Sequence, residues 1–345
     1  FFIVITNLDT STAWSIIQSV QISETPKRYL SSHLAARSRL GIYKKYNCFH
    51  KFFEGNHMFE LASLLGMART LNRTPLFFIE DESYAKMLAE MRIVIPGLVK
   101  QYHIVNGSVP LPTKTTFFTD RCCVYVNPKI LLNNDDLYLH LSGSFYQSWK
   151  YFPEMRGELL GYVKKSNKTS GLLPKSDIKT FVTCVHVRRG DFLLVGFAAS
   201  DARFIKSALK FIEEKEDPKK QNKVIVFFGD SIKFMKELSN DLLLVNGKQK
   251  KISHYISTNS PTDDLIYAKE NCDAVLISAP HSTFGWWIGY FSKYNKVYFM
   301  DIRATNDHVY GEGKLHPHDY YMPHWKSLIF ASDNITVLES NPKQK

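Results

Sequence analysis

The chain has 345 residues, a formal net charge of +11 at pH 7, and 44% hydrophobic and 14% aromatic residues. This length exceeds what one hydrophobic core normally supports, so we expect two folded domains. The positive charge suits nucleic acid, an anionic small substrate or an acidic glycan surface. Its densest runs lie in polar stretches typical of a solvated surface. Five cysteines without a CxxC pair argue against a zinc ribbon or a thioredoxin-like motif.

In chain order, the first half predicts an irregular α/β pattern. The apolar run 1–5 is too short to span a bilayer, and we interpret it as a first strand or the tail of a removed anchor. Because the chain begins with Phe1 rather than Met, we expect it to be a fragment or a processed form. Periodicity and turn residues then indicate helices and strands. They are helices at 56–71, 82–92 and 149–163, and strands at 74–79 and 123–126.

A polar stretch at 164–177 is the best candidate linker, so we expect an amino-terminal domain at 1–170 and a carboxy-terminal domain at 171–338. Beyond it, strands and helices alternate regularly. The expected strands are 181–187, 224–228, 242–245, 274–278 and 296–300, and the expected helices are 201–215, 231–238, 263–272 and 284–294. This alternation predicts a doubly wound parallel sheet, which binds ligands at the carboxyl ends of its strands.

Three of these strand ends carry polar side chains that we expect to converge. The first is a cluster of one His, two Arg and one Asp, and planar guanidiniums suit bidentate capture of phosphate. The second is a turn with a carboxylate, and the third places hydroxyls before a helix, where anions bind. The residues are His186, Arg188, Arg189 and Asp191, then Asp230, then Ser282 and Thr283. The alternatives are an interdomain salt bridge for the arginines and ordinary N-capping for the hydroxyls.

Other signals predict structure rather than chemistry. Trp286 and Trp287 fit core packing, and Cys184 and Cys272 fit small buried hydrophobes. The chain has no P-loop, no GxGxxG after a strand and no DxD, so a metal-bound nucleotide is not favoured. His316, His318 and His324 match no metal-ligand spacing, and we interpret them as part of a packed loop. Four N-x-S/T sequons give weak support for a secretory lumen. They lie at Asn72, Asn106, Asn167 and Asn334.

Three blocks of the chain together resemble the α1,2-fucosyltransferases of glycosyltransferase family 11, in a form close to nematode members. The blocks are HVRRGD at 186–191, FFGDSI at 227–232 and STFGWW at 282–287, and GNHMF at 55–59 is similar to the family's amino-terminal block. The resemblance implies a GT-B-like pair of facing Rossmann-type domains. It also implies GDP-fucose in the carboxy-terminal domain and the acceptor on the amino-terminal side.

The resemblance further implies roles for individual residues. Arg188 would bind the β-phosphate and stabilise the leaving GDP without a metal ion, and Asp191 is the best candidate base or else orients Arg188 or Arg189. His186 would lie near the nucleoside and Asp264 near the guanine edge. The remaining residues expected to contact the donor are Arg189, Asp230, Ser282, Thr283, Phe284 and, from the other domain, Asn56.

The implied activity is an inverting, metal-independent transfer of fucose from GDP-fucose to the 2-hydroxyl of a terminal galactose-like residue of a glycan. The implied setting is the Golgi lumen, with a membrane anchor outside this sequence and no nucleic-acid partner. The chain departs from the family at 35–54, a basic and aromatic insertion that could displace Asn56. An inactive homologue that binds nucleotide sugar or glycan is therefore the alternative. A nucleic-acid-binding protein rests on charge alone.

Overall fold

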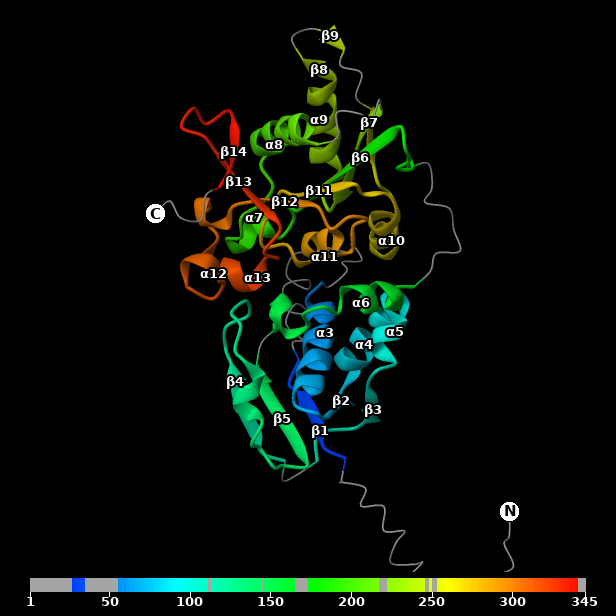
Figure 1. The fold of residues 1–345 in the computed structure, drawn as a ribbon, viewed down its shortest axis with the longest axis vertical. Coiled ribbons are helices and arrows are strands. Elements are labelled where there is room, and N and C mark those ends of the chain that lie inside the picture. Colours follow the sequence, from blue (N-terminus) through cyan, green and yellow to red (C-terminus); the bar gives the residue numbers. More distant parts are fainter. Residues whose placement is uncertain are drawn as a thin grey trace, which may run out of the picture.

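The computed structural model describes residues 27–34, 55–110, 113–143, 145–164, 173–216, 222–245, 248–249 and 253–340. They form two α/β lobes stacked along the long axis of the molecule (Figure 1). We call residues 27–164 the N-lobe and residues 173–340 the C-lobe. The predicted boundary at 170, the apolar run 1–5 and the insertion 35–54 lie outside the described residues.

The N-lobe is built on a five-stranded sheet in the order β3-β2-β1-β5-β4, and all four strand pairs are parallel. Its strands are β1 (Tyr29–Ser32), β2 (Thr74–Ile79), β3 (His103–Asn106), β4 (Thr115–Thr119) and β5 (Tyr138–Gly143). Its helices are α3 (Gly55–Thr70), α4 (Glu82–Val94), α5 (Pro96–Val99) and α6 (Arg156–Tyr162), with short 3-10 turns η1 (Pro128–Leu131) and η2 (Trp149–Tyr151). Every residue of α3 from Gly55 to Ala68 is buried, because this helix runs between the sheet and the C-lobe.

The C-lobe is built on a seven-stranded sheet in the order β10-β7-β6-β11-β12-β13-β14, parallel except for β14. Its strands are β6 (Thr180–Val187), β7 (Asn222–Gly229), β10 (Ser253–Ile256), β11 (Ala274–Ile277), β12 (Val297–Met300), β13 (Lys326–Phe330) and β14 (Val337–Glu339). Its helices are α7 (Phe192–Val195), α8 (Ala202–Lys215), α9 (Ile232–Leu243), α10 (Pro261–Asn271), α11 (Thr283–Phe291), α12 (His308–Gly311) and α13 (Pro317–Tyr320). The 3-10 turn η3 (Ile302–Ala304) and the hairpin of β8 (Leu244–Val245) and β9 (Lys248–Gln249) complete it.

Helices cover both faces of the C-lobe sheet. α8 and α9 lie on the face away from the N-lobe, whereas α10 and α11 lie on the face toward it (Figure 1). Alternate residues of β6 accordingly belong to two different cores: Val185 packs with α8 and α9, and Cys184 packs with α10 and α11. Two parallel α/β lobes that face each other are the GT-B-like architecture that the sequence predicts.

The two lobes share one aromatic core. The Phe59 ring of α3 lies 4.6 Å from the Trp286 ring and 5.0 Å from the Trp287 ring of α11, centroid to centroid. Phe152 of the N-lobe stacks on Trp287 at 5.8 Å. Both tryptophans are fully buried, which confirms that they pack in the core. This apolar contact fixes the orientation of the N-lobe relative to α11.

Three predicted elements of the chain are wrong in detail. The strand at 123–126 is a single bridge from Cys123 to Leu315, because the segment pairs with the C-lobe rather than with the N-lobe sheet. The helix at 149–163 is broken into η2 and α6 by Glu154, whose φ is +61°. α9 continues through the first half of the strand predicted at 242–245, and only Leu244–Val245 form a strand, β8.

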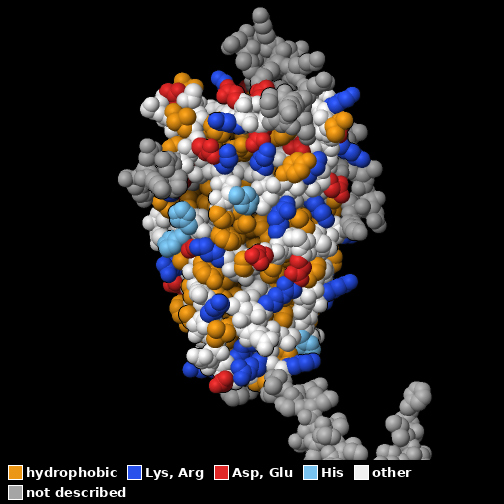
Figure 2. Space-filling model, in the orientation of Figure 1, with side chains coloured by type: hydrophobic (Ala, Val, Ile, Leu, Met, Phe, Trp, Pro, Cys, Tyr) orange, Lys and Arg blue, Asp and Glu red, His pale blue; other side chains and the backbone are white. Residues whose placement is uncertain are grey.

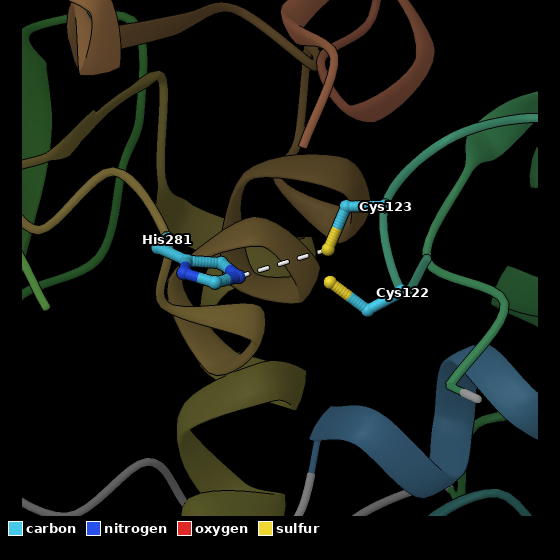
Figure 3. A group of neighbouring side chains, drawn as sticks. All are labelled: Cys122, Cys123 and His281. Atoms are coloured by element: carbon cyan, nitrogen blue, oxygen red, sulfur yellow. Dashed lines mark hydrogen bonds between the residues drawn. The ribbon is translucent and has the colours of Figure 1, made fainter. Parts of the chain in front are cut away.

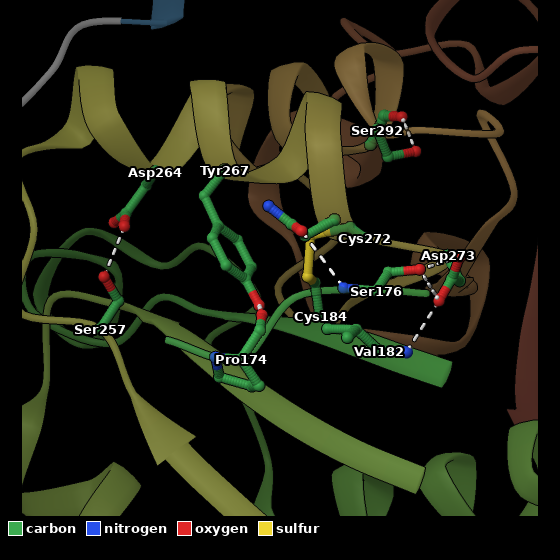
Figure 4. The surroundings of a disulfide bond; sticks show 12 residues. Pro174, Ser176, Val182, Cys184, Ser257, Asp264, Tyr267, Cys272, Asp273 and Ser292 are labelled. Atoms are coloured by element: carbon green, nitrogen blue, oxygen red, sulfur yellow. Dashed lines mark hydrogen bonds between the residues drawn. A yellow bond between two sulfur atoms is a disulfide. The ribbon is translucent and has the colours of Figure 1, made fainter. Parts of the chain in front are cut away.

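The interpretation of Cys184 and Cys272 as separate buried hydrophobes is wrong, because they form a disulfide (Figure 4). It joins β6 to the residue that follows α10, across 88 positions of sequence. Next to it, Asp273 accepts hydrogen bonds from the backbone N–H of Val182 and the hydroxyl of Ser176. The disulfide and Asp273 together tie α10 and the start of β11 to β6.

The surface carries no single basic patch on the face shown in Figure 2, where Lys and Arg are scattered over both lobes among acidic and apolar side chains. None of the helices in the described part of the chain is both long enough and apolar enough to cross a membrane.

Replacement of Phe59 by alanine should destabilise the protein by about 3–5 kcal/mol, because the cavity opens in the core that joins the lobes. Urea unfolding followed by circular dichroism and tryptophan fluorescence measures the effect. Ile93→Ala, at a side chain that is 57% exposed, is the matched control and should change stability little. Equal effects of the two substitutions would contradict a shared core.

Reduction of the Cys184–Cys272 disulfide should lower the free energy of unfolding by about 2–4 kcal/mol, because the bond restricts a long loop of the unfolded chain. Urea unfolding with and without a thiol reductant measures the loss. A Cys184→Ala/Cys272→Ala variant should unfold at the same urea concentration in both conditions. Reductant sensitivity that persists in this variant would place the effect elsewhere.

Candidate functional site

A cavity of about 290 Å³ lies between the lobes at the carboxyl ends of β6 and β11. Its wall combines charged, aromatic and small polar side chains from both lobes. The lining residues are Asn56, Cys122, Phe145, Gln147, Arg188, Asp191, Phe192, Val195, Phe197, His281, Ser282, Thr283, Phe284, His308 and Val309. Two of the three predicted strand ends therefore meet at one cavity, as the parallel sheet requires.

Arg188 follows the last residue of β6 and is held rigidly. Its Nη2 donates a hydrogen bond of 2.6 Å to Asp191, and its Nε lies 3.4 Å from Asp230. The guanidinium also lies over the Phe192 ring, 5.3 Å from its centroid, and its side chain is 12% exposed. A permanent cation in this setting is preorganised to bind an anion in the cavity.

Arg189 and Asp230 support this arrangement from outside the cavity lining. Arg189 donates to the Ser200 carbonyl and stacks over the Phe234 ring at 4.3 Å, so its side chain is committed to the C-lobe. Asp230 accepts a hydrogen bond from the Arg189 backbone N–H, and burial raises its pKa above the usual range. Gly229 permits this turn, because its φ is +157° and a Cβ there would lie 2.0 Å from the Val187 carbonyl.

His186, at the end of β6, lies beneath the first turn of α11. Burial and the charge of Arg188 lower its pKa to about 3, so the imidazole is neutral. Its Nε2 lies 3.4 Å from the Ser282 hydroxyl, and a Cβ on Gly285 would lie 2.6 Å from its Nδ1. His186 therefore contacts the helix start that borders the cavity rather than the cavity itself.

The starts of α3 and α11 meet at the cavity. A Cβ on Gly55 would lie 2.8 Å from the Thr283 backbone carbonyl carbon, so only glycine permits this approach. Trp287 Nε1 donates to the Gly55 carbonyl at 2.9 Å, and Ser282 caps α11. The N-capping interpretation of Ser282 is thus confirmed, and it leaves two positive helix ends facing the same space.

Asn56 connects the two lobes at this point. Its Oδ1 accepts hydrogen bonds from Thr283 Oγ1 at 2.9 Å and from Gln147 Nε2 at 3.1 Å. Both bonds use the oxygen, so neither partner uses the Nδ2 hydrogens of this cavity-lining amide. The insertion at 35–54 therefore does not move Asn56 away from the cleft.

Asp264 is not brought to the cavity lining and lies in the first turn of α10. It accepts a hydrogen bond of 2.5 Å from Ser257, which follows β10 (Figure 4). Burial raises the pKa of Asp264 to about 8, and its neighbour Asp263 adds to the shift. Its partner Ser257 follows β10, which lies two strands from β6 at the same carboxyl edge of the sheet as Arg188.

The sequence interpretation misses Cys122, Cys123 and His281, the one group of possible metal ligands within the described residues (Figure 3). Hydrogen bonds with Cys123 and His281 lower the pKa of Cys122 to about 6. Burial opposes charging of His281, but Asp307 and Cys122 raise its pKa to about 9. The adjacent cysteines are a visible signal, whereas their approach to His281 depends on the tertiary fold. His316, His318 and His324 form no such group.

Comparison with known proteins places the chain in a family. The model of "Glycosyl transferase family 11" matches residues 33–328. A Caenorhabditis elegans protein named "Putative galactoside 2-alpha-L-fucosyltransferase svh-11" is 48% identical over 318 residues, covering 92% of this chain and 84% of that protein. A second Caenorhabditis elegans protein, a galactoside 2-alpha-L-fucosyltransferase, is 32% identical and covers 79% of this chain and 74% of its own.

Among solved structures, the GDP complex of an Arabidopsis thaliana FUT1 mutant matches with a TM-score of 0.40 and 11% identity, over 96% of this chain and 87% of that one. The family model covers most of the chain, and the blocks at 186–191, 227–232 and 282–287 all lie within the match. The chain is a glycosyltransferase that belongs to glycosyl transferase family 11.

Proposed function

We propose that the protein transfers fucose from GDP-fucose to the 2-hydroxyl of a terminal galactose-like residue, with inversion at the sugar and without a metal ion. The observation that carries the proposal is Arg188, a partly buried guanidinium at the inter-lobe cavity beside the starts of α3 and α11. Fucosyltransferase relatives support the sugar and the hydroxyl that receives it.

The charge at the cavity suits a diphosphate leaving group. When the bond between fucose C1 and the β-phosphate oxygen breaks, the oxygen keeps the electron pair and negative charge develops there. Arg188 and the α11 start with Ser282 and Thr283 supply fixed positive charge and donors for it. These groups occupy the role that a divalent cation has in metal-dependent nucleotide-sugar enzymes, so we propose that none is required.

The acceptor hydroxyl attacks fucose C1 from the face opposite the diphosphate and must lose a proton. Asp191 lines the cavity, and its carboxylate already accepts a hydrogen bond from Arg188. We assign Asp191 the role of general base. Its carboxylate also holds Arg188 in place. In the N-lobe, the Asn56 side-chain amide lines the cavity and is best placed to donate a hydrogen bond to fucose or to the acceptor sugar.

The Golgi lumen is the proposed location. The Cys184–Cys272 disulfide fits an oxidising compartment, and the sequons at Asn106 and Asn334 fit the same compartment. A galactose-terminated glycan and GDP-fucose are the partners that this setting supplies.

Arg188→Ala should lower kcat/KM for GDP release from GDP-fucose with a β-galactoside by about 10²–10³-fold, because the fixed charge on the leaving group is lost. Arg188→Lys should recover only part of it, since an ammonium lacks the planar fork. EDTA should leave the wild-type rate unchanged. Arg203→Ala, at a side chain that is 77% exposed, is the matched surface control.

Arg189→Ala tests whether the second arginine binds GDP or only stabilises the turn after β6. We expect reduced stability but nearly normal GDP affinity per folded molecule, because Arg189 packs on Phe234. GDP affinity that is unchanged in Arg188→Ala would contradict the proposal. GDP-fucose binding without turnover in the wild type would instead establish the inactive homologue.

GDP affinity should rise with pH if Asp264 accepts hydrogen bonds from guanine. The carboxyl is protonated in the free protein below its pKa of about 8, and only the carboxylate accepts both guanine N–H groups. The expected slope approaches tenfold per pH unit between about pH 6.5 and about pH 8 and flattens above. Calorimetric titration with GDP should show this slope in the wild type, and in Asp263→Asn the rise should flatten at a lower pH, because the charge of Asp263 contributes to the raised pKa of Asp264. A slope that persists in Asp264→Asn would assign it to GDP or another group.

A further inference from the structure

Three possible metal ligands meet in the wall of the inter-lobe cavity. The sulfur atoms of Cys122 and Cys123 and a ring nitrogen of His281 all lie within 4.8 Å of one another. His281 Nε2 points at Cys123 Sγ, 3.7 Å away, and the Cys122 sulfur lies beside it (Figure 3). Small side-chain rotations would bring all three atoms to the 2.0–2.3 Å that Zn²⁺ requires.

The backbone around the two cysteines is held by hydrogen bonds to both lobes. Cys123 donates to the Lys314 carbonyl at 3.1 Å and accepts from the His316 N–H at 3.0 Å. Cys122 accepts at its carbonyl from the Gln147 N–H at 2.7 Å. These bonds hold the backbone that carries the two thiols beside His281.

His281 also has the outer partner that metal-binding histidines usually have. Asp307 Oδ1 lies 3.4 Å from His281 Nδ1, on the ring edge opposite Cys123. Asp307 is itself fixed by the backbone N–H groups of Ala198, Val309 and Tyr310. A carboxylate this close to Nδ1 favours the tautomer that carries its proton there and leaves Nε2 free to bind a metal.

We propose that Cys122, Cys123 and His281 bind Zn²⁺ in the wall of the cavity. Two thiolates and one imidazole favour zinc over the hard cations Mg²⁺ and Ca²⁺. Cys122 and His281 line the cavity, so a fourth position is open there to water or to a ligand atom.

This site goes beyond the proposed sugar transfer, which uses Arg188 and needs no metal. Binding replaces the thiol and imidazole protons, which are released to solvent. The ligands come from both lobes, so bound zinc links the 122–123 segment of the N-lobe to the loop before α11.

The test uses the full chain with Cys48→Ser, which removes the fifth cysteine as a possible zinc ligand. The Cys184–Cys272 disulfide is kept intact, and Cys122 and Cys123 are reduced. Zn²⁺ is titrated by calorimetry, and Co²⁺ is added as a spectroscopic probe. Variants in this background are Cys122→Ser, His281→Gln and the control His316→Gln/His318→Gln. The control removes two histidines of a nearby loop, and the backbone N–H of His316 bonds to Cys123.

We expect one Zn²⁺ per chain, a thiolate-to-cobalt charge-transfer band with intense tetrahedral visible bands, and a zinc-dependent rise in melting temperature. Cys122→Ser and His281→Gln should weaken zinc binding by more than about 100-fold, since loss of an outer partner alone costs about 10–100-fold. The histidine control should bind like the background protein.

Two results would overturn the proposal. One is zinc binding that Cys122→Ser retains and the histidine control loses. The other is the absence of a thiolate-to-cobalt band in protein whose Cys122 and Cys123 are confirmed as free thiols after Co²⁺ is added. These measurements use no sugar nucleotide, so their failure is separate from failure of the fucosyl-transfer proposal.

Discussion

The close approach of α3 and α11 is the constraint on which the site depends. Gly55 has no side chain, so the first turn of α3 can touch the backbone of Thr283, and Trp287 fixes the contact by bonding to the Gly55 carbonyl. Below this point, the Phe59 ring packs on both tryptophans of α11. The lobes are therefore held in one orientation by an apolar core, and the polar cavity lies at its edge. Packing in this core sets the directions of α3 and α11, so the amino-terminal ends of both helices face the cavity.

The C-lobe adds charge to this frame. Arg188 follows β6 at the cavity. Asp191 of the same turn and Asp230 of the turn after β7 hold its guanidinium, so little freedom remains to be lost when an anion binds. His186 stays neutral beneath α11, so it adds no charge of its own near the cavity. The cavity thus has a fixed positive side in the C-lobe and an amide, Asn56, from the N-lobe. This division suits a reaction in which one lobe holds the leaving group and the other meets the acceptor.

The sequence predicts the parts of this site that depend on local order. Alternating strands and helices place Arg188 and Ser282 at the same sheet edge, and the capping role of Ser282 follows from its position before an apolar helix. The direction of Arg189 could not be predicted, because Phe234 and Ser200 decide it through contacts distant in sequence. The Cys184–Cys272 pair, 88 positions apart, and the approach of His281 to two cysteines of the other lobe depend on tertiary packing in the same way.

The most direct test of the central claim is the structure of the reaction product. The protein is incubated with GDP-fucose, a β-galactoside and EDTA, and the purified product is examined by nuclear magnetic resonance. We predict fucose α-linked to the galactose 2-hydroxyl, since inversion converts the β-linked sugar of the donor. A β-linked product, a different hydroxyl, or no product from protein that binds GDP-fucose would contradict the mechanism proposed for the cavity around Arg188.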